Sequence, residues 1–132
     1  MTRLNVYQLG QIDYASSYIW QKEFTEHRRP DTVDQIWCLE HYPVYTLGLS
    51  GKSEHILGQN HIPIVHSDRG GQVTYHGPGQ LVIYLLLDLK RKGISVKKYV
   101  NLLEQAIICM LDALQISANR KIGAPGAYVN EK

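Results

Sequence analysis

The chain has 132 residues, of which 44% are hydrophobic and 20% charged, and its formal net charge is +2. This length suits one domain with a buried core that needs neither disulfides nor a metal ion to fold. A net charge this small argues against a nucleic-acid partner, because phosphate-binding faces concentrate many basic residues. The sequence therefore predicts a single domain over residues 1–132 with no nucleic-acid partner.

No long apolar stretch follows the first residues as it would in a signal peptide. The most apolar segment, Leu81–Leu89, contains Asp88 and is far shorter than a membrane span. Cys38 and Cys109 lie in apolar runs without Cys-x-x-Cys spacing, which is typical of free structural cysteines. The six histidines are scattered, so no metal site is predicted. We expect a cytoplasmic protein with no membrane contact, no metal and no cofactor.

Caps and apolar periodicity predict the elements of the first part of the chain. Asp13 is a suitable N-cap for a helix that runs to about Arg28 and is ended by Pro30. Strands are expected before and after this helix, at Leu4–Leu9, Gln35–Glu40, Val44–Leu47 and Ile62–Val65.

In the second part, Gln72–His76 and Gln80–Asp88 are expected as hairpin-like strands joined at a Gly-Pro-Gly turn. A helix should begin after Ser95, because apolar residues then recur at three- and four-residue steps as far as Leu114. Two helices among hairpin-like strands predict an α+β fold with a mixed, mostly antiparallel sheet. The chain ends just inside an expected strand at Ala127–Val129, which predicts a C-terminally incomplete domain with an unpaired sheet edge.

The segment Arg69–Gln80 carries four glycines in twelve residues. Adjacent glycines let the backbone approach a ligand closely, and the arginine, threonine, histidine and glutamine between them can orient a polar head group. A hairpin with glycine turns, a solvated Arg69 and a core-capping His76 fits the same residues equally well. A phosphate loop fits poorly, because the Walker lysine and the Gly-x-Gly-x-x-Gly order are absent.

The spelling Arg-Gly-Gly-x-x-Thr-Tyr-His-x-x-Gly-Gln-x-x-x-Tyr, over Arg69–Tyr84, resembles the characteristic block of the lipoyl(octanoyl) transferases. Segments similar to other motifs of this family occur in the same order at Glu40–Gly48, Gly51–Leu57 and Gly123–Val129. The chain therefore resembles the N-terminal part of an octanoyltransferase. The resemblance implies the catalytic-domain fold of the biotin/lipoate protein ligases.

The resemblance further implies transfer of an octanoyl group from octanoyl-acyl carrier protein to a lysine, through a thioester on a cysteine. The acceptors would be lipoyl domains of 2-oxoacid dehydrogenase complexes and the glycine cleavage H protein. In this scheme Thr74 and His76 supply polar contacts near the thioester, and Tyr75 either covers the pocket or packs away from it. The implied substrate-binding residues are Arg69, Gly70, Gly71, Gln72, Val73, Thr74, Tyr75 and His76.

The nucleophilic cysteine and its lysine partner are expected beyond Lys132, so no catalytic residue is assigned within the chain. Cys38 and Cys109 do not match the motif of the nucleophile, and Lys132 is interpreted as a solvated terminal lysine. His41 and His55 fall in resembling segments and are held open between site and loop residues. Two alternatives remain: a non-catalytic module that binds an acyl chain or carrier protein, and an ATP-dependent lipoate or biotin ligase.

Overall fold

The computed structural model describes residues 3–56 and 61–130, which fall into two compact units, 1–87 and 88–132. Leu57, in one of the segments that resemble the octanoyltransferases, and Lys132 lie outside the described residues. The expectation of one domain over the whole chain stays a prediction.

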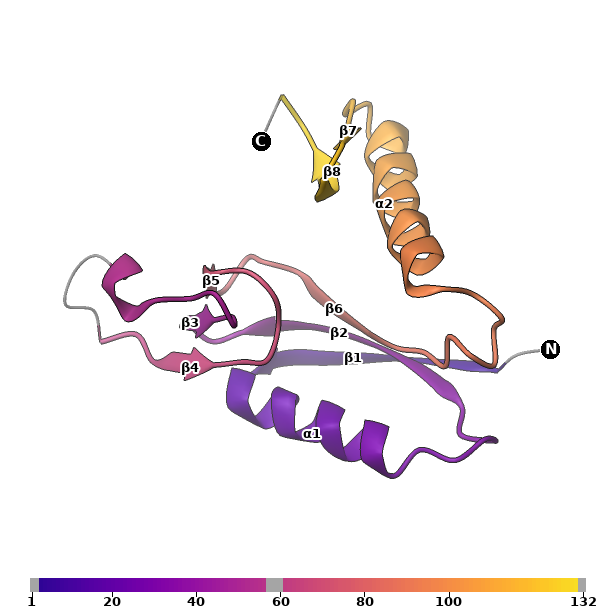
Figure 1. Cartoon of the computed structure of the whole chain (residues 1–132), viewed down its shortest axis with the longest axis horizontal. Helices are drawn as coiled ribbons and strands as arrows, with labels where there is room; N and C mark the ends of the chain where they lie inside the picture. The colour runs from indigo at the N-terminus through magenta and orange to yellow at the C-terminus, as the bar shows by residue number, and fades with distance from the viewer. Residues whose placement is uncertain (1–2, 57–60, 131–132) are drawn as a thin grey trace. The chain divides into compact units, whose positions relative to one another are not determined.

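The first unit is built around a three-stranded sheet and one helix. Strand β1 (Leu4–Ile12) leads through helix α1 (Tyr14–Glu26) to strand β2 (Asp34–His41), which pairs with β1 in parallel. Strand β6 (Val82–Leu86) pairs with β2 in the antiparallel direction, so the order is β1-β2-β6. Helix α1 runs along one face of this sheet (Figure 1). It begins at the expected cap, because Asp13 Oδ2 accepts a hydrogen bond from Ser16 N at 2.9 Å.

The core of this unit lies between α1 and the sheet. Alternation along β2 directs Trp37 and Leu39 to the same face, where they pack with Leu86. Phe24 of α1 meets the Trp37 ring edge-on at a centroid distance of 6.4 Å. The residues of β2 between these positions, among them Cys38, point to the opposite face of the sheet.

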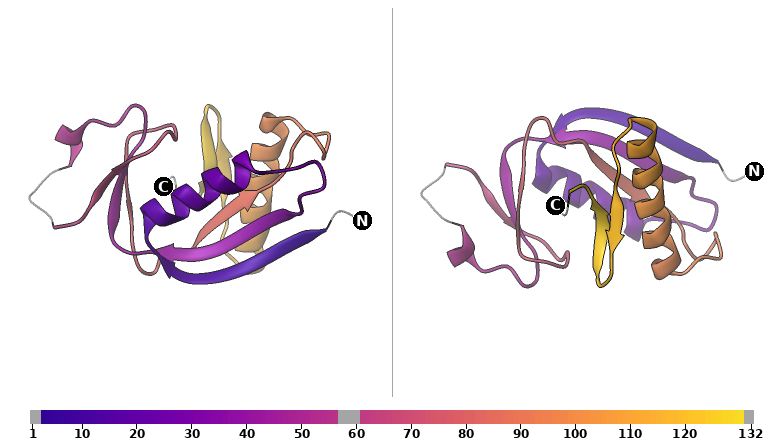
Figure 2. Two further views of the ribbon diagram at one scale, coloured as in Figure 1. Left: turned by 90° about the horizontal axis from the view of Figure 1, so that it is seen from below. Right: turned by 90° about the horizontal axis from the view of Figure 1, so that it is seen from above.

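A second three-stranded sheet in the same unit has the order β4-β3-β5. Strand β3 (Val44–Leu47) pairs in parallel with β4 (Ile64–His66) and in the antiparallel direction with β5 (Val73–His76). A single turn of 3-10 helix, η1 (Ser53–His55), lies in the connection between β3 and β4. Both sheets of the unit mix parallel and antiparallel pairs, which confirms the α+β class (Figure 2).

The expected hairpin between the strands on either side of residues 77–79 is wrong. Strand β5 pairs with β3, whereas β6 pairs with β2 in the other sheet. The chain passes from β2 to β3 through Tyr42 and Pro43, and it returns from β5 to β6 through residues 77–81. The stretch β2–β3 and the stretch β5–β6 therefore run antiparallel to each other in both sheets. Both stretches pass from one sheet to the other at the same place, residues 42–43 in the first and residues 77–81 in the second. At this place Gly79, with φ +88°, donates its N–H to Glu40 Oε2 at 3.0 Å.

The second unit consists of helix α2 (Val96–Ala113) and an antiparallel pair, β7 (Asn119–Lys121) and β8 (Ala124–Tyr128). The expected N-cap is confirmed, since Ser95 Oγ accepts from Lys98 N at 3.2 Å. The last strand begins three residues earlier than expected, directly after the turn at Gly123, whose φ is +74°. Helix α2 packs beside β8 in this unit (Figure 2).

Candidate functional site

The side chain of Arg69, the first residue of the glycine-rich segment 69–80, forms hydrogen bonds to strand β3. Its Nη2 donates to the backbone oxygen of Thr46 and to Thr46 Oγ1, both at 2.7 Å, and to Gln72 O at 2.9 Å. Its Nε donates to Thr46 Oγ1 at 3.1 Å, and its Nη1 to Gly70 O at 2.9 Å. Thr46 is 0% exposed. The guanidinium thus holds the segment 69–72 through charge-assisted hydrogen bonds, two of its acceptors being atoms of the buried Thr46.

The same segment lies directly against the backbone that follows β3. Gly48 N donates to Gln72 O at 2.9 Å, and Leu49 N donates to Arg69 O at 3.0 Å. A Cβ at Gly48 would stand 2.4 Å from Gly71 O, so this position has room only for a hydrogen. Gly71 has φ +87°, a conformation that other residues rarely adopt. The glycines therefore serve a close approach of two backbone segments, 48–50 and 69–72.

His41, at the end of β2, is 0% exposed and has partners at both ring nitrogens. Its Nδ1 lies 2.8 Å from Ile12 O, which can only accept, so the hydrogen is on Nδ1. Its Nε2 then accepts from the hydroxyl of Tyr84, also at 2.8 Å. Burial lowers the pKa of His41, and the neighbouring His76 acts in the same direction, while the bond to Ile12 opposes the shift. Burial also raises the pKa of Tyr84, which keeps its hydroxyl a donor.

His76 ends strand β5 and faces this histidine. The two rings meet edge-on, with centroids 6.0 Å apart. Tyr14, the first residue of α1, stacks on His76 at 5.9 Å with an interplanar angle of 12°. His76 Nδ1 lies 2.7 Å from Gln80 Oε1, and its Nε2 lies 3.3 Å from Thr46 Oγ1. The ends of β2 and β5, the start of α1 and the middle of β6 therefore converge on one aromatic cluster.

The structure brings some of the predicted site residues together and separates others. Arg69, Thr74 and His76 surround Thr46, whose hydroxyl lies 3.5 Å from Thr74 O. Tyr75 points to the other face of the strand, where its ring packs on Tyr45 at 5.5 Å. Of the two alternatives for Tyr75, the structure therefore shows the one in which it packs away from His76.

Several members of the cluster are not among the substrate-binding residues named from the sequence: Thr46, Tyr14, Tyr84 and Gln80, of which only Gln80 lies in the glycine-rich segment. Three of them, Thr46, Gln80 and Tyr84, could have been found from the sequence, because they occupy specified positions in the motifs that resemble those of the octanoyltransferases. Tyr14 carried no such signal, since an aromatic residue at the start of an amphipathic helix is ordinarily core. His41, held open before, belongs to the cluster. His55 lies in η1, in the connection between β3 and β4, and its role stays open.

Neither cysteine lies in the aromatic cluster. Cys38 is half-buried in β2 and points to the sheet face opposite His41 and Leu39. A cavity of about 490 Å³ opens on that face, lined by Cys38, Glu40 and Leu81 among others, and by no residue of 69–76. Cys109 is a free cysteine on α2, in the second unit; although it lies in an apolar run of the sequence, it is exposed and not a core residue. Its Sγ accepts from Gln105 Nε2 at 3.2 Å.

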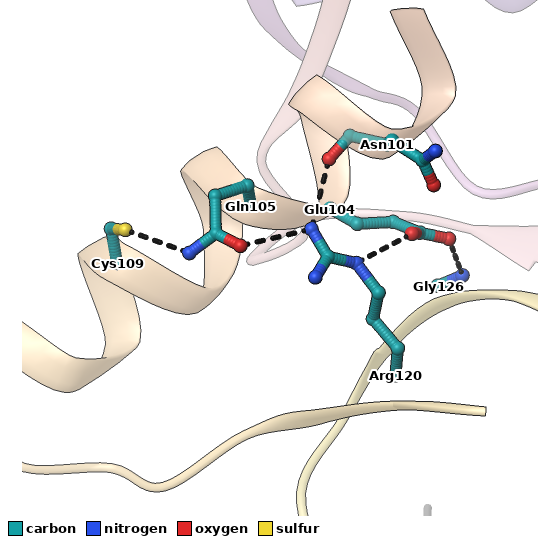
Figure 3. Close-up of polar contacts among 6 residues, drawn as sticks. All are labelled: Asn101, Glu104, Gln105, Cys109, Arg120 and Gly126. Carbon is teal, nitrogen blue, oxygen red and sulfur yellow. Dashed lines mark hydrogen bonds and ion pairs between the residues drawn. The ribbon is translucent and has the colours of Figure 1, made fainter. Parts of the chain in front are cut away.

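In the second unit, Glu104 holds the β7–β8 pair to α2 (Figure 3). Its Oε2 accepts from Arg120 Nε at 2.9 Å, and its Oε1 accepts from Gly126 N, also at 2.9 Å. Arg120 Nη2 continues the network to Asn101 O and Gln105 Oε1, both at 3.0 Å. One 8% exposed carboxylate therefore fixes both strands of the pair.

The part of the chain that the structure describes has neither a membrane-spanning helix nor a cluster of metal-binding side chains. Across residues 3–56 and 61–130, no helix is both long and apolar enough to span a bilayer. In the same residues, no three side chains of His, Cys, Asp or Glu gather closely enough to hold a metal ion.

The arrangement of elements is that of lipoate protein ligases. A lipoate-protein ligase A solved with bound ATP superposes with a TM-score of 0.69 over 98% of this chain and 54% of that one, at 16% identity. A bipartite lipoate protein ligase of Thermoplasma acidophilum, solved in a study of that ligase and its E2 lipoyl domain, gives 0.64 over 91% and 48%, at 15% identity. At such identities the likeness shows the fold alone.

Sequence comparison identifies the family. The model of the lipoyl protein ligase A/B catalytic domain matches residues 13–132, and the chain belongs to this family. It is 54% identical over 123 residues to the octanoyltransferase of Methylibium petroleiphilum, covering 93% of this chain and 55% of that protein. It is 51% identical over 127 residues to the octanoyltransferase of Legionella pneumophila strain Lens, covering 96% and 64%. The chain thus spans little more than half the length of these relatives.

Proposed function

We propose that this protein takes part in octanoyl transfer from octanoyl-acyl carrier protein to a lysine of lipoyl domains, through a cysteine thioester. The observation that carries the proposal is the identity of 51% to 54% with proteins named octanoyltransferase, over 92% to 99% of the chain. We propose a cytoplasmic location and, as acceptors, lipoyl domains of 2-oxoacid dehydrogenase complexes and the glycine cleavage H protein. The nucleophile in this proposal is neither Cys38, which faces away from the aromatic cluster, nor Cys109, because neither cysteine matches the motif of the nucleophile.

We further propose that residues 69–76 form the wall of the acyl site. Gly70 has no atom within 4 Å of the place a Cβ would occupy, so a ligand can approach its backbone. Thr74 and His76 share the inward face of β5, beside the ring of Tyr14, and give the wall polar and aromatic contacts. Gln72, Val73 and Tyr75 support it by pairing with β3 and the residues after it, and Arg69 supports it through Thr46.

The test uses the 132-residue chain and titrates it with octanoyl-acyl carrier protein while backbone amide signals are followed by NMR. We expect saturable shifts at Gly70, Gly71, Thr74 and His76 that carrier protein without the acyl group does not produce. Gly70→Val should keep the fold, because its Cβ enters open space, and should abolish these shifts. Cys38→Ser is the matched control that should bind like the parent. Equal shifts with the unacylated carrier, or normal acyl binding by Gly70→Val, would contradict the proposed wall.

An ATP-dependent ligase is the second candidate, and the observation in its favour is the fold shared with a lipoate-protein ligase solved with ATP. Such an enzyme activates a free acid as an adenylate. The spelling of residues 74–80, Thr-Tyr-His-Gly-Pro-Gly-Gln, favours the transferase. ATP–pyrophosphate exchange with free octanoate or lipoate separates the two, because only a ligase sustains robust exchange.

A further inference from the structure

We propose that Arg69 is a positioning residue: acting through the hydroxyl of Thr46, it fixes the neutral ring of His76 with its hydrogen on Nδ1. The consequence for acyl binding rests on the proposed function, whereas the state of the ring does not. The inference follows from a count of donors and acceptors along the row Arg69, Thr46, His76 and Gln80.

The hydroxyl of Thr46, like any hydroxyl, offers two acceptor lone pairs and one hydrogen. Arg69 Nη2 and Nε both donate to Thr46 Oγ1, at 2.7 and 3.1 Å; Nη2 shares its two hydrogens among Thr46 Oγ1, Thr46 O and Gln72 O, and still directs one of them at Oγ1, so that a donor faces each lone pair. Arginine stays protonated in proteins, so these two donors are permanent. The Thr46 hydroxyl is left only as a donor.

Two acceptors lie within reach of that hydrogen, His76 Nε2 at 3.3 Å and Thr74 O at 3.5 Å. Nε2 is the nearer, and it can accept only if it carries no hydrogen itself. A hydrogen on Nε2 would instead point at an oxygen whose lone pairs Arg69 already occupies. The two hydrogen bonds from Arg69 to Thr46 Oγ1 therefore select which nitrogen of His76 carries the hydrogen, although Arg69 does not contact that ring.

The other end of the row agrees. His76 Nδ1 lies 2.7 Å from Gln80 Oε1, and an amide oxygen can only accept, so the hydrogen is on Nδ1. The reversed amide would donate to Nδ1 and force the hydrogen onto Nε2, which is the arrangement that Arg69 excludes. Arg69 thereby also orients the Gln80 amide, eleven residues further along the chain.

The row changes what His76 can do in an acyl site. Both ring nitrogens are engaged with protein groups, and Tyr14 stacks on one face of the ring. The ring is therefore an aromatic surface held at a fixed angle at the end of β5, and proton transfer by either nitrogen would first break a bond of the row. His41 has the same pattern, with Nδ1 bound to Ile12 O and Nε2 to Tyr84. In the proposed acyl site His76 shapes the wall, and the fully buried His41 supports it through the edge-on contact between the two rings.

The experiment measures the 15N shifts of the histidine rings in the full 132-residue chain, at about pH 8, above the ordinary histidine pKa of about 6.5. The His76 signals are assigned by their loss in His76→Gln. We expect a protonated-type shift for His76 Nδ1 and an acceptor-type shift for Nε2. A hydrogen on Nε2 in the parent chain overturns the proposal.

The variants then test the role of Arg69. Arg69→Met frees the lone pairs of Thr46, so the two ring shifts should move toward each other as the second tautomer appears. Arg69→Lys, which still donates, should restore part of the separation. A folded Arg69→Met chain with unchanged ring shifts overturns the proposal.

A second pair of variants applies if Arg69→Met does not fold. Thr46→Val has nearly the same shape without the hydroxyl, and it should move the Nε2 shift toward that of an unbonded acceptor nitrogen. Thr46→Ser keeps the hydroxyl and should match the parent. An unchanged Nε2 shift in Thr46→Val overturns the proposed row. No substrate is present in any of these measurements, so their outcome is independent of whether the chain binds octanoyl-acyl carrier protein.

Discussion

Gly48→Ala is the sharpest probe of the junction between strand β3 and the glycine-rich segment. The new Cβ would stand 2.4 Å from Gly71 O, 2.8 Å from Gly70 O and 2.9 Å from Arg69 O. All three are backbone atoms, so no side-chain rotation relieves the contacts. The backbone angles of Gly48 are not the obstacle, because its φ lies outside the left-handed region. The substitution therefore tests close approach alone.

The geometry sets the magnitude. Ordinary contact begins near 3.4 Å, so the Gly71 oxygen must withdraw by about 3.4 − 2.4 = 1.0 Å. Gly48 N, Leu49 N and Ser50 N donate to this segment at 2.9 to 3.2 Å, and such a displacement would lengthen those bonds beyond useful range. Two to three lost bonds at roughly 1 kcal/mol each give a loss of about 2–3 kcal/mol in the free energy of unfolding. This agrees with the usual cost of overpacking, about 1–3 kcal/mol.

Urea unfolding followed by tryptophan fluorescence is the assay. Both tryptophans, Trp20 and Trp37, belong to the first unit, so the signal reports that unit. Gly70→Ala is the matched control: it lies in the same segment, its Cβ meets nothing within 4 Å, and its stability should stay within about 0.5 kcal/mol of the parent. If Gly48→Ala is as stable as the parent, or if Gly70→Ala costs as much, the close-approach reasoning is refuted.

Three further predictions concern other parts of the chain. The pKa of His41 is lowered in the folded state, so on acidification from about pH 7.5 to 5.5 the unfolded chain binds a proton that the folded chain does not. The free energy of unfolding should therefore fall, by at most about 1.4 kcal/mol per pH unit. Urea titrations of His41→Gln over the same pH range should lack this contribution to the pH dependence. Arg28→Met removes the guanidinium partner of Asp34, which is 0% exposed, and should cost about 3–5 kcal/mol in the same assay; a loss under 1 kcal/mol would contradict a buried ion pair. Glu104→Ala should speed amide hydrogen exchange at Gly126 by about ten- to a hundredfold, because the Gly126 N–H loses its charged acceptor. Glu104→Gln keeps an acceptor oxygen and should change the exchange rate less. Equal exchange rates in the two variants would count against the hydrogen bond from Gly126 N to Glu104 Oε1.

Local signals in the sequence were sufficient for most elements. The caps Asp13 and Ser95 are where expected, because N-capping depends only on a side chain and the amides two or three residues later. Strand β3 has the predicted bounds, Val44–Leu47, since Pro43 and Gly48 interrupt extended structure on either side. The pairing of strands was not accessible in this way, and the expected hairpin at residues 77–79 is wrong. Pairing is decided by contacts between distant segments, here β5 with β3 and β6 with β2.

The sequence by itself determined the family and pointed to residues 69–76 as the proposed acyl site, because the residue pattern over 69–84 and its ordered neighbours is a property of the chain alone. Only the tertiary structure decided how these residues act on one another. Arg69 is 23 residues from Thr46, and His41 is 43 residues from Tyr84, yet each pair is joined by hydrogen bonds of 2.7 to 3.1 Å. Sequence patterns carry no information on which donor meets which acceptor across such separations. That pairing arises when two sheets bring β2, β3, β5 and β6 to one place, where buried polar groups must find partners.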